Sequence, residues 1–163
     1  MITVISCSHY PDDERIYHKE IKTLVEKKYS VNYFTLSESE QNLSDKYIKH
    51  MNYNSAKHSI KDYIDLVEQK IRETSTKVVH IHEPELFSLA IRIKKTIGAK
   101  IIYDVHEDYI SMIYTFSRWN KHIKYLRSKY WLLKERYFLQ HVDEIIIASS
   151  TIVNSDFKTQ GFS

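Results

Sequence analysis

Ionisable side chains of this sequence gather at three places, each at or just after the end of a short apolar run. They include histidines, carboxylates and an arginine, which are the residue types that transfer protons and bind phosphates or metal ions. The apolar runs are residues 2–7, 77–81 and 100–105. Because a polar group follows each of these three runs in the same way, a functional site is expected in these segments.

The first group lies in the loop of residues 7–15 and the start of the segment that follows. Asp12 or Asp13 is a candidate helix N-cap, because a carboxylate there accepts hydrogen bonds from unpaired backbone N–H groups. Arg15 could face a cleft and bind a phosphate or a hydroxyl group. Cys7 and Arg15 are two residues too far apart for a Cys-x5-Arg phosphate loop, so a thiol nucleophile is excluded.

The second group contains His80, His82 and Glu83. Alternate residues of a strand point to the same side, so the two histidines could bind a metal ion together. A histidine at a strand end can equally be held by a neighbouring backbone group. Glu83 precedes Pro84, which favours an extended backbone at Glu83 and would aim its side chain across a crevice.

The third group contains Asp104, His106, Glu107 and Asp108. Charged side chains rarely gather at the end of a buried strand without a ligand, an ion pair or a helix N-terminus to satisfy them. Asp108 is a candidate cap for the next helix. His106 is the strongest single candidate for a functional residue.

The composition narrows the classes of protein. The only glycines are Gly98 and Gly161, too few for the phosphate-binding loops of dinucleotide-binding or P-loop proteins. A net charge of +3 without a block of like charges gives no indication of nucleic-acid binding. The single cysteine cannot form an intramolecular disulfide, and no apolar run reaches the roughly 18 residues of a membrane span. A cytoplasmic location is therefore predicted.

Apolar runs of strand length alternate with segments of helical periodicity along the chain. The expected strands are residues 2–7, 30–36, 77–81, 100–105 and 144–148. The expected helices are residues 14–27, about 55–74, 85–97, about 120–140 and 149–158, whereas 37–55 are expected to be mostly loop. This order predicts one α/β domain, a Rossmann-like parallel sheet with helices on both faces. Ligands bind outside the carboxyl ends of such strands, where the three polar groups lie.

The predicted helix of residues 120–140 has an apolar stripe that is expected to face the core. The stripe consists of Ile123, Leu126, Tyr130, Leu133 and Tyr137. Aromatic residues and cations share the rest of the segment, a combination typical of helices that contact anionic lipid headgroups. Residues 118–138 are therefore a candidate for peripheral membrane contact.

Three motifs in this order resemble the N-terminal domain of family 4 glycosyltransferases of the GT-B fold. They are Asp-Asp-Glu-Arg-Ile-Tyr-His-Lys-Glu at 12–20, His-Ile-His-Glu-Pro-Glu-Leu at 80–86, and Ile-Tyr-Asp-Val-His-Glu-Asp at 102–108. Asp-Glu-Ile-Ile-Ile-Ala-Ser-Ser at 143–150 extends the match over nearly the whole chain. The family transfers a sugar from a nucleotide-sugar to an acceptor hydroxyl, with retention at the anomeric carbon and generally without a metal ion.

The resemblance implies roles for individual residues. His106 matches the catalytic histidine that lies near the transferred sugar. Arg15, His82, Glu83 and Glu107 are the expected substrate-binding residues, with His82 and Glu83 on the acceptor side. No metal ligand and no cofactor are expected.

The family has two domains of this kind, and residues 1–163 match only the first of them, the acceptor-side domain. The donor site belongs to the C-terminal domain, so the isolated chain is expected to be inactive without that domain or a separate partner chain. The expected partner molecules are a glycan or lipid-linked acceptor, with no nucleic acid. The expected pathway is synthesis of a cell-envelope polysaccharide or a teichoic-acid-like glycan, at the inner face of the membrane.

Two other classes remain open at this point. A small metal-dependent hydrolase could use His80, His82, Asp104 and His106, although barrels of that kind usually need about 250 residues. A protein-interaction module could dock a partner on the face that carries the polar groups.

Overall fold

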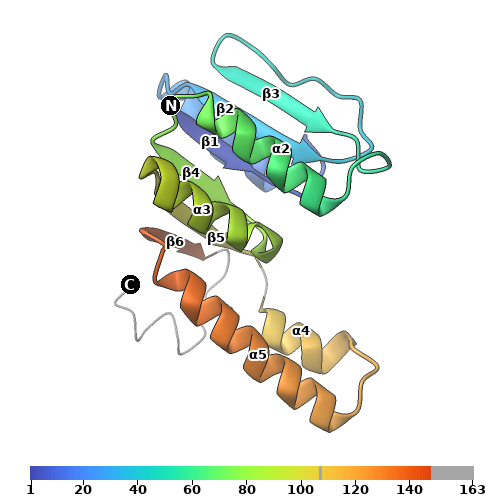
Figure 1. Ribbon diagram of the computed structural model, residues 1–163. Coiled ribbons are helices and arrows are strands. Elements are labelled where there is room, and N and C mark those ends of the chain that lie inside the picture. The colour runs from blue at the N-terminus through green and yellow to red at the C-terminus, as the bar shows by residue number, and fades with distance from the viewer. Residues whose placement is uncertain (107, 148–163) are drawn as a thin grey trace.

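The computed structural model describes residues 1–106 and 108–147, and these form a single six-stranded parallel sheet with helices on both sides (Figure 1). The strands follow the spatial order β3-β2-β1-β4-β5-β6, and every neighbouring pair is parallel. Their bounds are β1 Ile2–Ile5, β2 Val31–Leu36, β3 Ile48–Tyr53, β4 Val78–Ile81, β5 Lys100–Val105 and β6 Glu144–Ile147. The predicted fold class, a Rossmann-like α/β domain, is confirmed.

Helices connect successive strands except β2 and β3, which are joined by a loop. Their bounds are η1 Glu14–Ile21, α1 Lys22–Glu26, α2 Ile60–Arg72, η2 Pro84–Leu86, α3 Phe87–Ile97, α4 Tyr109–Phe116 and α5 Lys121–Leu139. Gly98 ends α3 in the left-handed region with φ of 70°, as its place after the apolar periodicity predicts. The helix predicted over 149–158 and the last residue of the predicted strand 144–148 lie outside the described residues.

The segment of residues 37–55 was expected to be mostly loop, and this prediction is wrong, because β3 lies within it. β3 pairs only with β2 and forms one edge of the sheet. An edge strand has a neighbour on one side only and tolerates polar side chains. Lys49, His50 and Asn52 therefore interrupt the apolar pattern without preventing the strand.

The predicted helix of residues 14–27 exists, but it is not one α-helix. Residues Glu14–Ile21 form a π-helix, and the short α1 continues from it. Asp13 is the N-cap, with its Oδ1 accepting hydrogen bonds from the backbone N–H groups of Arg15 and Ile16 at 2.9 Å each. The predicted capping carboxylate is thus Asp13.

The two faces of the sheet bury different side chains. On the face covered by α2, α3 and the end of α5, the strands contribute apolar residues to one core cluster, including Ile5, Phe34, Ile81 and Tyr103. On the opposite face, η1 packs its buried isoleucines on a smaller cluster around Val4 and Tyr33. His80 pairs in register with Val4, so it lies on the η1 face.

The pair α4–α5 extends away from the sheet (Figure 1). Only the C-terminal part of α5 reaches the core, where Phe138 and Leu139 are buried. The predicted core stripe of this helix is wrong: its residues are exposed, with Leu126 at 66% and Leu133 at 67%. The helical period identified a real apolar stripe, but the buried residues of α5 lie on the opposite side of the helix, so the stripe faces away from the core.

Candidate active site

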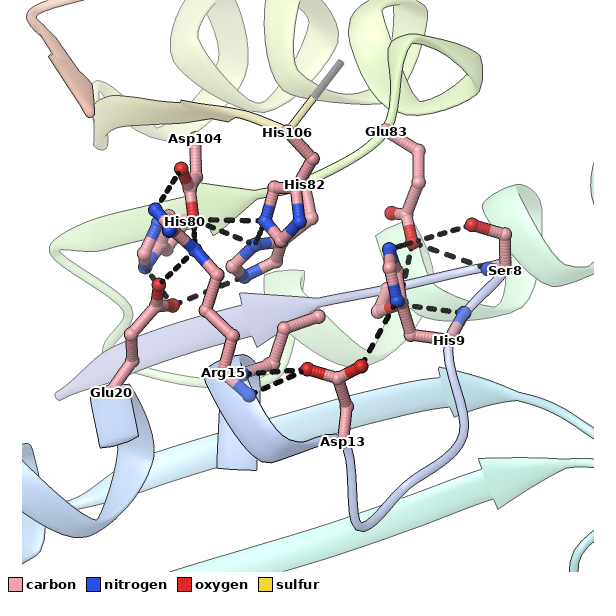
Figure 2. A network of polar contacts seen from close by, with 12 residues as sticks. Ser8, His9, Asp13, Arg15, Glu20, His80, His82, Glu83, Asp104 and His106 are labelled. Carbon is pink, nitrogen blue, oxygen red and sulfur yellow. Dashed lines mark hydrogen bonds and ion pairs between the residues drawn. The ribbon is translucent and has the colours of Figure 1, made fainter. Parts of the chain in front are cut away.

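The site is built at the carboxyl ends of β1, β4 and β5, where η1 crosses them (Figure 2). The polar side chains form two connected groups, one around Asp104 and one around Glu83. His9 and Asp13 lie between η1 and the Glu83 group.

Arg15 joins η1 to β5 through a two-point contact with Asp104. Its Nε donates to Asp104 Oδ2 at 2.9 Å, and its Nη2 donates to Oδ1 at 2.7 Å. Asp104 is fully buried, whereas the Arg15 side chain is partly exposed. A bidentate arginine contact fixes both the position and the plane of a carboxylate, so Asp104 is held in one orientation.

The same carboxylate orients two histidines. His106 Nε2 lies 2.9 Å from Asp104 Oδ2 and 3.1 Å from His82 Nδ1. His82 is buried, and the His106 side chain keeps 16% of its surface exposed. Because an ionised carboxylate only accepts hydrogen bonds, Asp104 fixes a proton on the Nε2 of His106. The ring of His106 is therefore the solvent-accessible end of a series of hydrogen-bonded side chains.

Glu83 has a different role from the one its motif suggests. Its backbone is extended, with φ of −120° and ψ of 146°, as predicted for a residue before proline. Its side chain does not face an open crevice: it is buried, and its Oε1 accepts hydrogen bonds from Ser6 Oγ at 2.6 Å and from Ser8 N at 3.2 Å. Glu83 thus holds the loop after β1 in place.

The two carboxyls of the Asp104 group, buried Asp104 and partly buried Glu20, have opposite pKa shifts. Burial, followed by the neighbouring Asp104, raises the pKa of Glu20 to about 8. Burial also acts to raise the pKa of Asp104, but hydrogen bonds, first from His106 and then from His82, hold it well below its usual range. Burial lowers the pKa of His80 and His82. One ionised carboxylate thus lies among neutral neighbours and Arg15.

The open side of the site is formed by residues that the buried network positions. His9 Nδ1 lies 3.2 Å from Asp13 Oδ2, and the ring centroids of His9 and His106 are 5.2 Å apart. Beside His9 is a hollow of about 440 Å³ at the carboxyl ends of β1 and β2. Its lining contains Cys7, Ser8, His9, Tyr10, Leu36, Ser37, Glu38 and Ser55.

The predicted site residues are brought together in part. Arg15, His82 and His106 converge on Asp104, and Glu83 reaches this group only through His9, whose Nε2 lies 3.8 Å from Glu83 Oε1. Glu107 lies outside the described residues. The exclusion of Cys7 as a nucleophile is supported, because burial raises the pKa of its thiol well above the ordinary value.

Sequence reasoning missed Glu20 and His9. Glu20 follows Arg15 by five residues, a spacing that separates side chains on an α-helix. The π-helix has a wider turn, and it brings Arg15 Nε within 3.2 Å of Glu20 Oε1. No pattern in the sequence marked the π-helix. His9 was present in the first loop but had no helical or strand spacing to single it out.

Comparison with known proteins supports the fold and does not extend beyond it. No protein-family model and no curated protein sequence matches the chain. Among solved structures, the chain is similar to sucrose-phosphate synthase from Thermosynechococcus elongatus, with a TM-score of 0.68 and 11% identity. The similarity covers 99% of this chain and 45% of that one. The chain therefore shares the fold of somewhat less than half of a larger enzyme.

Proposed function

We propose that the chain is the acceptor-side domain of a glycosyltransferase that moves a sugar from a nucleotide-sugar to an acceptor hydroxyl. The proposal includes membership of family 4, retention at the anomeric carbon, and an acceptor in cell-envelope polysaccharide or teichoic-acid-like glycan synthesis. The observation that carries it is the series of hydrogen-bonded side chains from Arg15 through Asp104 to the accessible ring of His106. The fold shared with part of a sugar-transferring synthase is consistent with it.

Glycosyl transfer needs hydrogen bonds to sugar hydroxyls that strengthen as the anomeric carbon gains positive charge. His106 is suited to this role, because its Nε2 is held by Asp104 and its other ring nitrogen can contact a ligand. His82 and Asp104 act as positioning residues, since both are buried. The diphosphate contacts belong to the second domain of the complete enzyme.

The hollow beside His9 is the proposed acceptor site. Its lining has the hydroxyl groups of Ser8, Ser37 and Ser55 and the exposed ring of Tyr10. Hydroxyls can exchange hydrogen bonds with a glycan, and an aromatic ring provides an apolar surface for the face of a sugar. Glu83 supports this site indirectly by holding the loop that carries Ser8 and His9.

The test is binding of acceptor fragments to the chain, measured by saturation-transfer NMR. The probes are neutral oligosaccharides and short poly(glycerol phosphate) oligomers. We expect Tyr10→Ala and His106→Ala to weaken binding by about tenfold, equal to about 1.4 kcal/mol, while His122→Ala, on the exposed surface of α5, leaves it unchanged. Equal binding by all three variants, or no binding of any probe by the wild-type chain, would contradict the proposed acceptor site.

The exposed surface of α4 and α5 supports peripheral membrane contact as part of the same proposal. None of the helices in the described residues has the length and apolar composition to cross a membrane. Exposed Leu126, Tyr130 and Leu133 instead share α5 with cations, and Arg127 lies 4.0 Å from the ring centroid of Trp119. Apolar and aromatic side chains with basic residues suit an interface with anionic lipid.

Vesicle sedimentation tests this contact. The chain is expected to bind vesicles that contain phosphatidylglycerol and to bind phosphatidylcholine vesicles weakly, with affinity falling as salt rises. The double variant Leu126→Ser/Leu133→Ser should lose most of the binding, and Tyr29→Ser, which removes an exposed aromatic elsewhere, should not. Binding that ignores lipid charge, or that survives the double variant, would argue against this role of α5.

A further inference from the structure

Four side chains from three elements meet in the interior on the η1 face: Glu20, His80, His82 and Asp104 (Figure 2). One potential ligand atom from each lies within 4.8 Å of every other. Glu20 Oε2 is 3.7 Å from His82 Nε2 and 3.9 Å from His80 Nδ1. His106 is not part of this set. The geometry therefore differs from the group of two histidines, Asp104 and His106 that the sequence first indicated.

Hydrogen bonding inside the protein leaves this group unsatisfied. Among the described residues, Glu20 Oε2, His80 Nε2 and His82 Nε2 are buried polar atoms without a hydrogen-bond partner. His80 and His82 are both more than nine-tenths buried. A buried polar atom without a partner destabilises the fold, so Glu20 Oε2 and His82 Nε2, two such atoms 3.7 Å apart, indicate a missing ligand.

We propose that Glu20, His80, His82 and Asp104 bind one divalent transition-metal ion of the zinc class, in a structural site. Two imidazoles and two carboxylates suit zinc better than magnesium or calcium, which prefer oxygen ligands alone. Tetrahedral ligands about 2.0–2.2 Å from zinc lie roughly 3.4 Å apart. The separations of 3.7 and 3.9 Å come within reach of that spacing through small side-chain rotations.

The neighbouring residues support these ligands. His82 Nδ1 lies 3.4 Å from Asp104 Oδ2, and a proton held on Nδ1 by this carboxylate leaves Nε2, the nitrogen nearest Glu20, free to bind the ion. Contacts of this kind fix the ligating nitrogen in protein metal sites. Arg15 contacts Asp104 and Glu20, so its charge offsets part of the negative charge of the two carboxylates. Two nitrogen ligands and a partly offset negative charge favour a borderline ion over a hard cation.

Among the described residues, this group is open to a hollow on the η1 face, from which an ion can reach it. The hollow has a volume of about 360 Å³, and its lining includes His80, Glu20, Ile102 and Ile146. The rest of the lining is mostly apolar. The site joins η1 to β4 and β5, and it shares Asp104 and His82 with the group that positions His106.

The test is direct metal binding by the chain, purified with a chelator and then dialysed. Zn²⁺ is titrated in competition with a chromogenic chelator, and Co²⁺ is added separately to record its visible absorption bands. We expect one equivalent of either ion, a Co²⁺ spectrum typical of tetrahedral coordination, and a higher Tm with Zn²⁺. His80→Gln and Glu20→Gln should weaken Zn²⁺ binding by more than about 10- to 100-fold, the loss that changes in outer contacts already cause.

His122→Gln is the matched control, because it removes an exposed histidine far along the chain from the cluster. Circular dichroism of each apo variant separates lost binding from lost folding, and the wild-type Co²⁺ spectrum does not depend on any variant. Equal weakening by the control, no binding by the wild type, or an octahedral Co²⁺ spectrum without a rise in Tm would overturn the proposal.

Discussion

The two faces of the sheet are made by the same strands but are stabilised in different ways. On the α2–α3 face, Phe87 stacks on Phe138 with ring centroids 3.7 Å apart, and both side chains are buried among aliphatic residues. On the η1 face, buried histidines and carboxyls replace most of that apolar area around β4 and β5. The apolar face depends on packing, whereas the polar face depends on having every charge and hydrogen bond matched.

The largest expected effect is on the apolar face. Phe87→Ala removes a buried ring that packs on Phe138 and meets Tyr103 edge to face at 5.1 Å. We expect a loss of about 3–5 kcal/mol in the free energy of unfolding, because the cavity cannot close. Urea denaturation measures it. Phe116→Ala, at an exposed ring on α4, is the control and should change stability by less than about 0.5 kcal/mol.

On the polar face, we expect the effects of two substitutions on stability to depend on each other, because the charges interact. Arg15→Ala and Asp104→Ala each remove one side of a contact and leave a charged or polar partner without it. Each should lower the free energy of unfolding by about 1–3 kcal/mol. The loss is smaller than for a fully buried pair, because Arg15 is partly exposed.

The double variant tests that coupling. It should cost less than the sum of the two single changes, by about 0.5–3 kcal/mol. A double-mutant cycle by urea denaturation, with chelator present, measures this difference. Simple additivity would show that the Arg15–Asp104 contact adds no coupling energy.

His50, near the edge of the η1 face, predicts a pH effect. Its Nδ1 accepts a hydrogen bond from Leu43 N at 3.3 Å, its Nε2 lies 2.9 Å from Thr35 Oγ1, and burial lowers its pKa to about 4. The unfolded chain therefore binds the proton at higher pH than the folded chain. Stability should fall as pH drops from about 6.5 towards 4, by about 2 kcal/mol for this residue.

Buried His80 and His82 add to the same slope, so the comparison between wild type and His50→Gln isolates the contribution of His50. The variant should lose part of the pH dependence in chemical denaturation between pH 6.5 and pH 4.5. Parallel curves for the two proteins would show that His50 does not titrate as its contacts indicate.

The smallest expected effect is at the start of η1. Asp13→Ala removes the carboxylate that accepts from two backbone N–H groups, and we expect a loss of about 1 kcal/mol. Asp12→Ala is the control, because Asp12 is exposed and accepts only from the Gln41 side chain. Thermal unfolding of both variants measures the difference. Equal shifts would mean that the cap does not anchor η1.

Much of the fold could be predicted because it depends on local patterns. Apolar runs marked the strands other than β3, and Gly98 marked the end of α3. The observed caps Asp13, one of two candidates at its position, and Asp108 were among the predicted caps. β3 was missed because an edge strand does not need an apolar pattern on both faces. The α5 stripe was assigned to the core because periodicity gives the direction of a face but not what lies opposite it.

The sequence by itself determined that histidines, carboxylates and an arginine follow the ends of three strands of a parallel sheet. Only the tertiary structure decided how they combine, because contacts such as Arg15 with Asp104 join residues 89 positions apart. It also decided which of them are accessible: His106 keeps an open surface, while His82 and Glu83 are buried. The π-helix adds Glu20 to this group, and no local spacing in the chain specifies it.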